Sequence, residues 1–255
     1  MKEGNYGSFH VVGVGPGDPE LITMKGVKVI ESADVIVAPS GRAGGASTAL
    51  EIVAGAVSLD GKEVLSMHFP MVRIDLDGDN TAASAAWKKV AEVIANRMRQ
   101  GRRVVFPTLG DPAFYSTAFY VISALSALDD PPGRVRVVPG VSAMGACAAT
   151  AGMPTVLAGE MLAVVPALFS DDRLEETLAA FDSIVLMKVN RSMERIIAIL
   201  ERMSLVEYAV LVERTTMADE RIWQDIRTAP REGLHYFSTV IVRKRGMEMR
   251  PAAFS

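Results

Sequence analysis

Short apolar runs alternate with segments of helical periodicity along the first half of the chain. The segment AWKKVAEVIANRMRQ has one apolar face at helical spacing, formed by Trp87, Val90, Ala91, Ile94 and Met98. Gly101 is expected to end that helix. Buried strands that alternate with helices are typical of a mostly parallel sheet. The predicted strands are FHVVGVG, DVIVAPS, EVLSM, RRVVFPTLGD and VRVVPG, and the other predicted helices are ELITMKGVKVIESA and AFYSTAFYVISAL.

The second half has less regularly spaced strands. GACAATAG predicts a helix of small residues and SMERIIAILERM an amphipathic helix, while SIVLMKV, YAVLVE, HYFSTVIVRK and EMLAVVPALF are the candidate strands. We therefore expect an α/β protein of two α/β domains with an active cleft between them. The first, 1–139, has a mostly parallel sheet with helices on both faces, and the second, 140–255, has a mixed sheet.

Composition narrows the classes of function. Hydrophobic residues make up 49% and charged residues 22% of the chain, and the net charge is −3, so no general affinity for nucleic acid is expected. No run approaches the roughly 18 apolar residues of a membrane span, and MKEGNYGSFH lacks the apolar core of a signal peptide. We expect a cytoplasmic protein without a membrane partner.

No metal site is expected. Cys147 is the only cysteine, and it is expected to pack in the core, while the three histidines, His10, His68 and His235, are far apart. The polar segment RIDLDGDN (73–80) resembles a calcium loop but lacks the closing glutamate and flanking helices.

The loop after the first predicted strand has glycines but is a poor phosphate cradle. Gly13 and Gly15 match a GxGxxG motif, whereas the third position is Asp18. Pro16 has no N–H to donate, and Asp18, predicted to cap a helix that begins at Pro19, would repel a phosphate. The loop therefore favours a ligand without phosphates, and a plain tight turn is the alternative.

Two further loops follow predicted strands. In PTLGDPAFYS (107–116), Gly110 permits close approach of the backbone, and Asp111 is either a ligand-binding acceptor or a helix cap. In VVPGVSAMGA (137–146), Ser142 is a candidate cap for the next helix. Because the carboxyl ends of parallel strands meet at one edge of a sheet, the three loops are expected to converge there and bind a ligand.

These motifs make the chain recognisable. GVGPGDPELITMKGVKVIESADVIVAP, PTLGDPAFYS and VVPGVSAMGACAATAGMP together resemble the tetrapyrrole methylase family, whose members methylate corrinoid and sirohaem precursors with S-adenosylmethionine. The segments FPM, GDPAFYST, MKVNR and HYFSTVIVRK resemble the branch that methylates carbon-20 of precorrin-2 or cobalt-factor II in cobalamin biosynthesis. The resemblance covers nearly the whole chain and implies a homodimer and a tetrapyrrole substrate.

The resemblance also implies the site residues. S-adenosylmethionine has no phosphate, which agrees with the first loop. Orientation and exclusion of water are the main needs of methyl transfer, and Asp111 and Tyr115 are the candidates for moving the proton that leaves the substrate carbon. The cofactor contacts implied by the family are Gly15, Pro16, Leu109, Gly110, Asp111, Phe114, Ser142, Ala143, Met187 and Thr215, the last at a position where relatives often have glycine.

The implied substrate carries many carboxylates, so cations are expected to face it. The candidates are Arg42, Arg73, Lys188 and Arg191, and an ordinary surface charge is the alternative for each. Met144, Met153 and Met187 are candidates for lining an apolar macrocycle pocket, and core packing is the alternative for the first two.

Three other functions remain open. The first is a methylase of another branch, acting at a different corrin carbon, on uroporphyrinogen III or on a diphthine-type substrate. The second is an NAD-dependent dehydrogenase, which the broken GxGxxG motif and Ser40, at the place of an acidic ribose ligand, disfavour. The third is a non-catalytic tetrapyrrole carrier. Whether the macrocycle arrives with cobalt is left open by the sequence.

Overall fold

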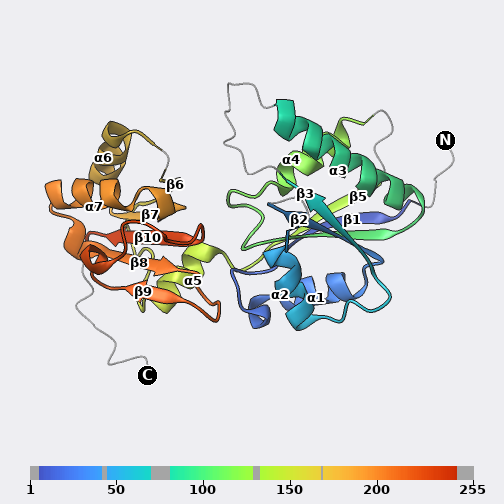
Figure 1. Ribbon diagram of the computed structural model, residues 1–255, viewed down its shortest axis with the longest axis horizontal. Helices are drawn as coiled ribbons and strands as arrows, with labels where there is room; N and C mark the ends of the chain where they lie inside the picture. Colours follow the sequence, from blue (N-terminus) through green and yellow to red (C-terminus); the bar gives the residue numbers. More distant parts are fainter. Residues whose placement is uncertain (1–5, 42–44, 70–80, 129–132, 168, 246–255) are drawn as a thin grey trace. The chain divides into compact units, whose positions relative to one another are not determined.

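The computed structural model describes residues 6–41, 45–69, 81–128, 133–167 and 169–245 (Figure 1). The chain divides into two compact units, Met1–Ser142 and Ala143–Ser255. Each unit has one five-stranded sheet with helices packed on both faces. The predicted fold class, two α/β domains with a parallel first sheet and a mixed second sheet, is confirmed.

The first sheet is parallel throughout, with the order β3-β2-β4-β1-β5. Its strands alternate with helices along the chain, so each crossover returns to the same end of the sheet. The strands are β1 (Ser8–Gly13), β2 (Val35–Ser40), β3 (Glu63–His68), β4 (Arg103–Thr108) and β5 (Arg134–Val138), and the helices are α1 (Met24–Glu31), α2 (Thr48–Ala56), α3 (Thr81–Arg99) and α4 (Ala118–Ser126).

Alternate residues of β1, β2 and β4 supply two separate cores. Phe9 and Val11 of β1 pack with α3 and α4 on one face, whereas Val12 and Val14 pack with α1 and α2 on the other (Figure 1). The predicted apolar face of α3 is confirmed, because all five of its residues are buried, and Gly101, with φ +77°, ends the helix.

The first predicted helix is wrong in its opening turn. A helix was expected from Glu20 to Ala33, but Pro19–Leu21 form only a short 3₁₀ turn, η1, and α1 begins at Met24. The reason is a second cap: the Thr23 hydroxyl accepts the Gly26 N–H at 3.0 Å, which starts a new helix. Asp18 still caps its turn as predicted, since its side chain accepts the Glu20 N–H at 2.8 Å.

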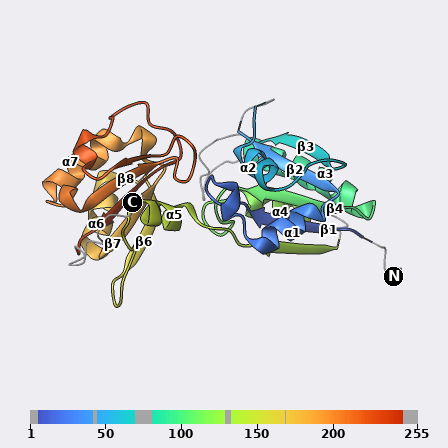
Figure 2. The same ribbon diagram turned by 90° about the horizontal axis from the view of Figure 1, so that it is seen from below.

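The second sheet is mixed, with the order β6-β7-β10-β8-β9. Among its described strands, only β6 and β7 pair in parallel, and β10 runs antiparallel between β7 and β8. A long loop, residues 151–161, joins α5 to β6 (Figure 2, yellow-green). The elements are α5 (Ala143–Thr150), β6 (Leu162–Pro166), α6 (Asp171–Ala180), β7 (Ser183–Met187), α7 (Met193–Arg202), β8 (Ala209–Glu213), β9 (Arg221–Trp223) and β10 (Ser238–Arg243), with short 3₁₀ turns η2 (Val189–Arg191), η3 (Val206–Tyr208) and η4 (Ile226–Thr228).

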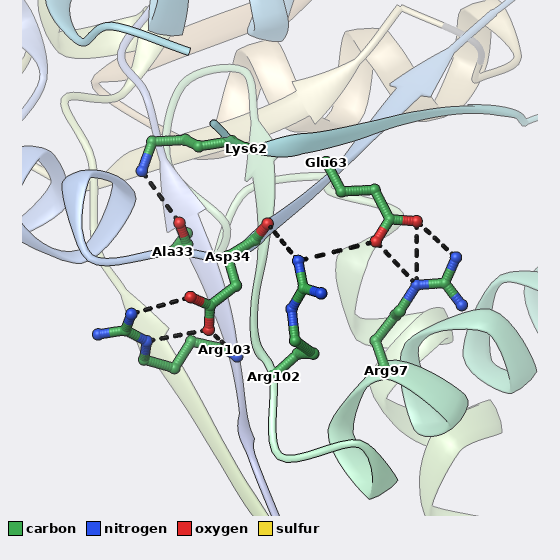
Figure 3. A network of polar contacts seen from close by, with 7 residues as sticks. All are labelled: Ala33, Asp34, Lys62, Glu63, Arg97, Arg102 and Arg103. Carbon is green, nitrogen blue, oxygen red and sulfur yellow. Dashed lines mark hydrogen bonds and ion pairs between the residues drawn. The ribbon is translucent and has the colours of Figure 1, made fainter. Parts of the chain in front are cut away.

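Ion pairs tie the strands of the first sheet together at its amino end (Figure 3). Asp34, just before β2, accepts the Arg103 backbone N–H at 2.8 Å and the Arg103 guanidinium at 2.9 Å. Glu63, which begins β3, pairs with Arg97 of α3 at 2.5 Å. Lys62 donates to the carbonyl of Glu31, the last residue of α1, and to the carbonyl of Ala33. The hydrogen bonds from Arg103 hold the pKa of Asp34 at about 2.

Candidate functional site

Three glycines pack backbone against backbone at the carboxyl end of the first sheet. A Cβ atom built on Gly13, at the end of β1, would lie 2.7 Å from the Gly110 carbonyl oxygen and 2.7 Å from the Gly140 nitrogen. One built on Gly140 would lie 2.3 Å from the Gly110 oxygen. No side chain fits in these spaces, so the predicted convergence of the loops after β1, β4 and β5 is confirmed.

Hydrogen bonds join the first two loops beyond the end of the sheet. Gly15 and Gly110 form an antiparallel bridge, in which the Gly110 N–H donates to the Gly15 carbonyl at 2.7 Å and the reverse bond is 3.3 Å long. Both glycines have positive φ, +77° and +69°. Because L-residues rarely adopt this backbone conformation, glycine is needed at both positions.

The first loop is closed to a phosphate. Gly15 and Pro16 are buried, and Pro16 has no N–H to donate. The carboxylate of Asp18 already occupies the N-terminus of η1, where a phosphate would otherwise bind. A ligand bound at this loop therefore depends neither on a hydrogen bond from the nitrogen of residue 16 nor on a vacant helix N-terminus.

Asp111 links the second loop to the third. Its Oδ1 accepts the Ala113 N–H at 2.7 Å, and its Oδ2 accepts the Gly140 N–H at 2.8 Å. The second bond spans 29 residues of sequence and holds Gly140 beside Gly110. Each carboxylate oxygen thus binds backbone, and the role of Asp111 in proton transfer stays a prediction.

Two aromatic side chains follow Asp111 on the second loop. Phe114 is 40% exposed and Tyr115 is 46% exposed, which leaves both accessible to a ligand. Tyr115 has a positive φ of +53°, and burial raises the pKa of its phenol. A phenol with a raised pKa stays protonated at neutral pH and is a hydrogen-bond donor.

Two predicted residues of the second unit, Met187 and Thr215, lie at one edge of its sheet. Met187 ends β7, and Thr215 follows β8 by two residues. β10 lies between these strands, and its Thr239 pairs with Met187 on one side and Val212 on the other. A pocket of about 770 Å³ opens at this edge, and its lining includes Arg214, Glu220, His235 and Tyr236. Ser142 and Ala143 lie at the start of α5.

Backbone strain gathers beside the predicted cofactor residues. Six non-glycine residues among those described have positive φ, and four of them are Tyr115, Lys188, Arg214 and Thr216. Tyr115 follows Phe114, Lys188 follows Met187, and the other two flank Thr215. Each such conformation costs about 1–3 kcal/mol and is found preferentially at functional sites. Sequence reasoning had no signal for this strain, because these residue types are not typical of the conformation.

The predicted substrate cations are only partly described. Arg42 and Arg73, like the loop 73–80, lie outside the described residues. The Lys188 ammonium lies 5.3 Å from the centre of the Tyr236 ring, and Arg191 is exposed at the end of η2. Their role toward a substrate stays a prediction.

The cysteine and the three candidate methionines pack in one core cluster. Cys147 is 2% exposed beneath the second sheet, as expected, and burial raises the pKa of its thiol to about 11. Met144, Met153 and Met187 are partly buried against the same cluster. Within the described residues, no group of three or more His, Cys, Asp or Glu side chains is arranged to hold a metal ion, and no helix is long and apolar enough to cross a membrane.

Comparison with known proteins decides the family. The family described as Tetrapyrrole (Corrin/Porphyrin) Methylases matches residues 8–229. The chain belongs to this family. The cobalt-precorrin-2 C(20)-methyltransferase of Salmonella typhimurium is 33% identical over 94% of this chain and 97% of its own length. The precorrin-2 C(20)-methyltransferase of a Sinorhizobium species is 34% identical over 91% of this chain and 93% of its own length.

Solved structures of the family share the fold. A cobalt-precorrin-4 methyltransferase aligns over 95% of this chain and 97% of its own with a TM-score of 0.66 and 21% identity. A uroporphyrin-III C-methyltransferase from Thermus thermophilus, solved in complex with S-adenosylhomocysteine, aligns over 93% of this chain and 92% of its own with a TM-score of 0.64 and 20% identity. At these identities the likeness establishes the architecture.

Proposed function

We propose that this protein transfers a methyl group from S-adenosylmethionine to carbon-20 of precorrin-2 or cobalt-factor II in cobalamin biosynthesis. The observation that carries the proposal is the loop after β1, which lies in a nucleotide-binding position but is closed to phosphate by Pro16 and Asp18. The substrate is proposed from the two relatives named as C(20)-methyltransferases, which match more than nine-tenths of the chain.

The residues of the first unit suit this cofactor. S-adenosylmethionine has a ribose, an adenine and an amino-acid part but no phosphate. The Gly13, Gly110 and Gly140 backbones pack too closely to admit side chains of their own, so a ligand at this edge meets backbone and the flanking Leu109 and Phe114. When bound, the cofactor supplies an electrophilic methyl group on a sulfonium, and the protein supplies position and exclusion of water. The proposed contacts in the second unit are Ala143, Met187 and Thr215, with Ser142 just before them.

Loss of a proton from the methylated carbon completes the reaction. The meso carbon of a reduced tetrapyrrole is electron-rich, so a strong base is not required before methyl transfer. Tyr115 and Asp111 are the proposed groups for moving the proton. The Asp111 carboxylate, whose oxygens also accept two backbone N–H groups, is the proposed acceptor of that proton. Tyr115, which is protonated at neutral pH, relays it only by giving up its own proton as it receives another. Of the two, Tyr115 has the more accessible side chain.

The many carboxylates of the proposed substrate need cationic partners. We propose Lys188 and Arg191 for this role, together with Arg42 and Arg73. A charge-assisted bond to a carboxylate is stronger than a neutral one, and arginine forms it in bidentate geometry. We further propose a cytoplasmic homodimer, and light scattering on the purified protein tests whether it is a dimer.

The second candidate function is methylation of uroporphyrinogen III. A uroporphyrinogen III methyltransferase of Methanosarcina barkeri is 29% identical over 86% of this chain and 82% of its own length. The higher identity and coverage of the C(20)-methyltransferases favour carbon-20.

The deciding experiment is turnover with ¹³C-methyl S-adenosylmethionine. The purified enzyme is incubated separately with precorrin-2, cobalt-factor II and uroporphyrinogen III, and each product is analysed by mass spectrometry and carbon NMR. We expect one added methyl, at carbon-20, with at least one of the first two substrates and no reaction with the third. Labelling at another carbon, or turnover of uroporphyrinogen III alone, would contradict the proposal.

A further inference from the structure

A small polar network holds the turn that follows β8. The Thr150 hydroxyl, at the end of α5, donates to Glu220 Oε2 at 3.1 Å and lies 3.1 Å from the Thr215 hydroxyl. The same Glu220 oxygen accepts the Thr216 backbone N–H at 2.6 Å. Because Thr150 donates its proton to Glu220, the Thr215 hydroxyl is the donor to Thr150. One carboxylate oxygen thus fixes both the side chain and the following backbone of Thr215.

The turn needs such support. Arg214 and Thr216 have positive φ values of +52° and +63°, so Thr215 lies between two strained residues. The Arg214 N–H donates to the Phe237 carbonyl at 2.8 Å, which anchors the turn before Thr215. After Thr215, the bond from Thr216 to Glu220 has the same effect.

Within the described residues, the Thr215 backbone has unused hydrogen-bonding groups. Thr215 is only 5% exposed, and within the described part of the chain its backbone N–H and C=O have no hydrogen-bond partner. Buried backbone groups are paired in more than about nine cases of ten. An unpaired donor and acceptor in a rigid, strained turn are typical of a place where a ligand completes the bonding.

We propose that Glu220 is a positioning residue for the cofactor: through Thr150 and the Thr216 N–H, it holds the Thr215 backbone in its ligand-binding conformation. The inference rests on the proposed function, since Thr215 is one of the proposed cofactor contacts. Glu220 acts as a hydrogen-bond acceptor, so its oxygen matters and its charge does not. It affects cofactor affinity and leaves the methyl-transfer step itself unchanged.

The test compares four variants by calorimetric titration with S-adenosylhomocysteine and by steady-state kinetics. Glu220→Ala removes the acceptor, Glu220→Gln keeps one oxygen, and Thr150→Val removes the bridging hydroxyl at similar volume. Glu207→Ala is the matched control, because Glu207 is a 69%-exposed glutamate of the same unit whose ion-pair partner among the described residues is Arg227. Wild-type protein is titrated first, and failure of the wild type to bind would overturn the proposed function and this inference together.

Given wild-type binding, we expect Glu220→Ala to weaken affinity at least tenfold and Thr150→Val severalfold. Glu220→Gln should stay within about threefold of wild type, Glu207→Ala should be unchanged, and kcat at saturating cofactor should be within about twofold in all. Equal loss in the Ala and Gln variants would mean that the charge acts directly on the ligand and would overturn the proposal. A fall in kcat without a fall in affinity would overturn it too. If Glu220→Ala does not fold, Thr150→Val and Glu220→Gln still decide.

Discussion

The two ends of the first sheet are held together by different chemistry. At the amino end, charged side chains join the elements: Asp34, before β2, pairs with Arg103 of β4, and Glu63 of β3 pairs with Arg97 of α3 (Figure 3). At the carboxyl end, backbone meets backbone at Gly13, Gly110 and Gly140, and the Asp111 carboxylate there accepts two backbone N–H groups.

The difference reflects whether each end of the sheet has to leave space for a ligand. Ion pairs at the amino end occupy the space around the strand termini and place long side chains over it. Glycines at the carboxyl end join the loops without filling the space beyond them, so backbone remains accessible to a ligand. Substitutions at the carboxyl end should therefore affect binding, and those at the amino end should affect stability alone.

The largest effect is expected from Gly140→Ala. The added Cβ would lie 2.3 Å from the Gly110 oxygen, so the third loop must move away from the first two. We expect binding of S-adenosylhomocysteine to be lost and the free energy of unfolding to fall by about 1–3 kcal/mol. Calorimetry and denaturant unfolding measure the two quantities. Gly159→Ala is the control, because a Cβ there has nothing within 4 Å and no effect is expected; wild-type binding by folded Gly140→Ala would refute the close-packing account.

Asp111→Ala should have the next largest effect. The change leaves the Gly140 and Ala113 N–H groups without their acceptor, at a cost of about 1–3 kcal/mol. We expect cofactor affinity to fall about tenfold or more, measured by calorimetry, and Asp111→Asn, which keeps one acceptor, to be intermediate. If the Asn variant binds normally but has no activity, the carboxylate acts in proton transfer and its role in holding the loops is minor.

At the amino end, Asp34→Asn should reduce stability without affecting binding. Folding lowers the pKa of Asp34 from 3.8 to about 2, so its contribution is present above pH 3.8 and is lost as the pH falls toward 2. Because Arg103 is half exposed, we expect the substitution to lower the free energy of unfolding by about 1–2 kcal/mol at neutral pH. Denaturant unfolding between pH 2 and 7 should show a shallower acid dependence in the variant. Weaker cofactor binding by Asp34→Asn at pH 7 would contradict the proposal that the amino end of the sheet affects stability and the carboxyl end affects binding.

The smallest effect is expected from Glu63→Gln. Its pairs with Arg97 and Arg102 are partly exposed, and pairs of this kind contribute about 0.2–1 kcal/mol. The loss in unfolding free energy should shrink further as salt is raised, because screening weakens the wild-type pairs. Thermal unfolding at low and high ionic strength measures this. A loss as large as that of Asp34→Asn, unchanged by salt, would show that the pair is effectively buried.

The sequence predicted the strands and the loops because their signals are local. The apolar runs, the glycines after them and the cap at Asp18 are all read within a few residues. The same local reading placed a helix across Thr23, where two competing caps lie close together, and began another at Ala113, although α4 starts at Ala118. It also missed β9, whose three residues are mostly exposed. A short exposed strand has no apolar alternation to reveal it.

The interactions that shape the candidate site join distant parts of the sequence. Asp111 reaches Gly140 across 29 residues, Thr150 reaches Glu220 across 70, and Asp34 reaches Arg103 across 69. No periodicity or spacing rule connects such pairs, and a single sequence does not distinguish them from ordinary surface charges. The resemblance to the tetrapyrrole methylases indicated which loops to examine, and the structure supplied the contacts within them.

The most direct test of the separation between the two ends is an NMR titration of protein labelled with ¹⁵N-glycine. Gly13, Gly15, Gly110 and Gly140 report on the carboxyl end of the sheet, whereas Gly61 and Gly101, just before β3 and β4, report on the amino end. On addition of S-adenosylhomocysteine, we predict shifts in the first four amide signals and none in the other two, and no shifts with NAD. Shifts confined to Gly61 and Gly101, or an equal response to NAD, would contradict the account.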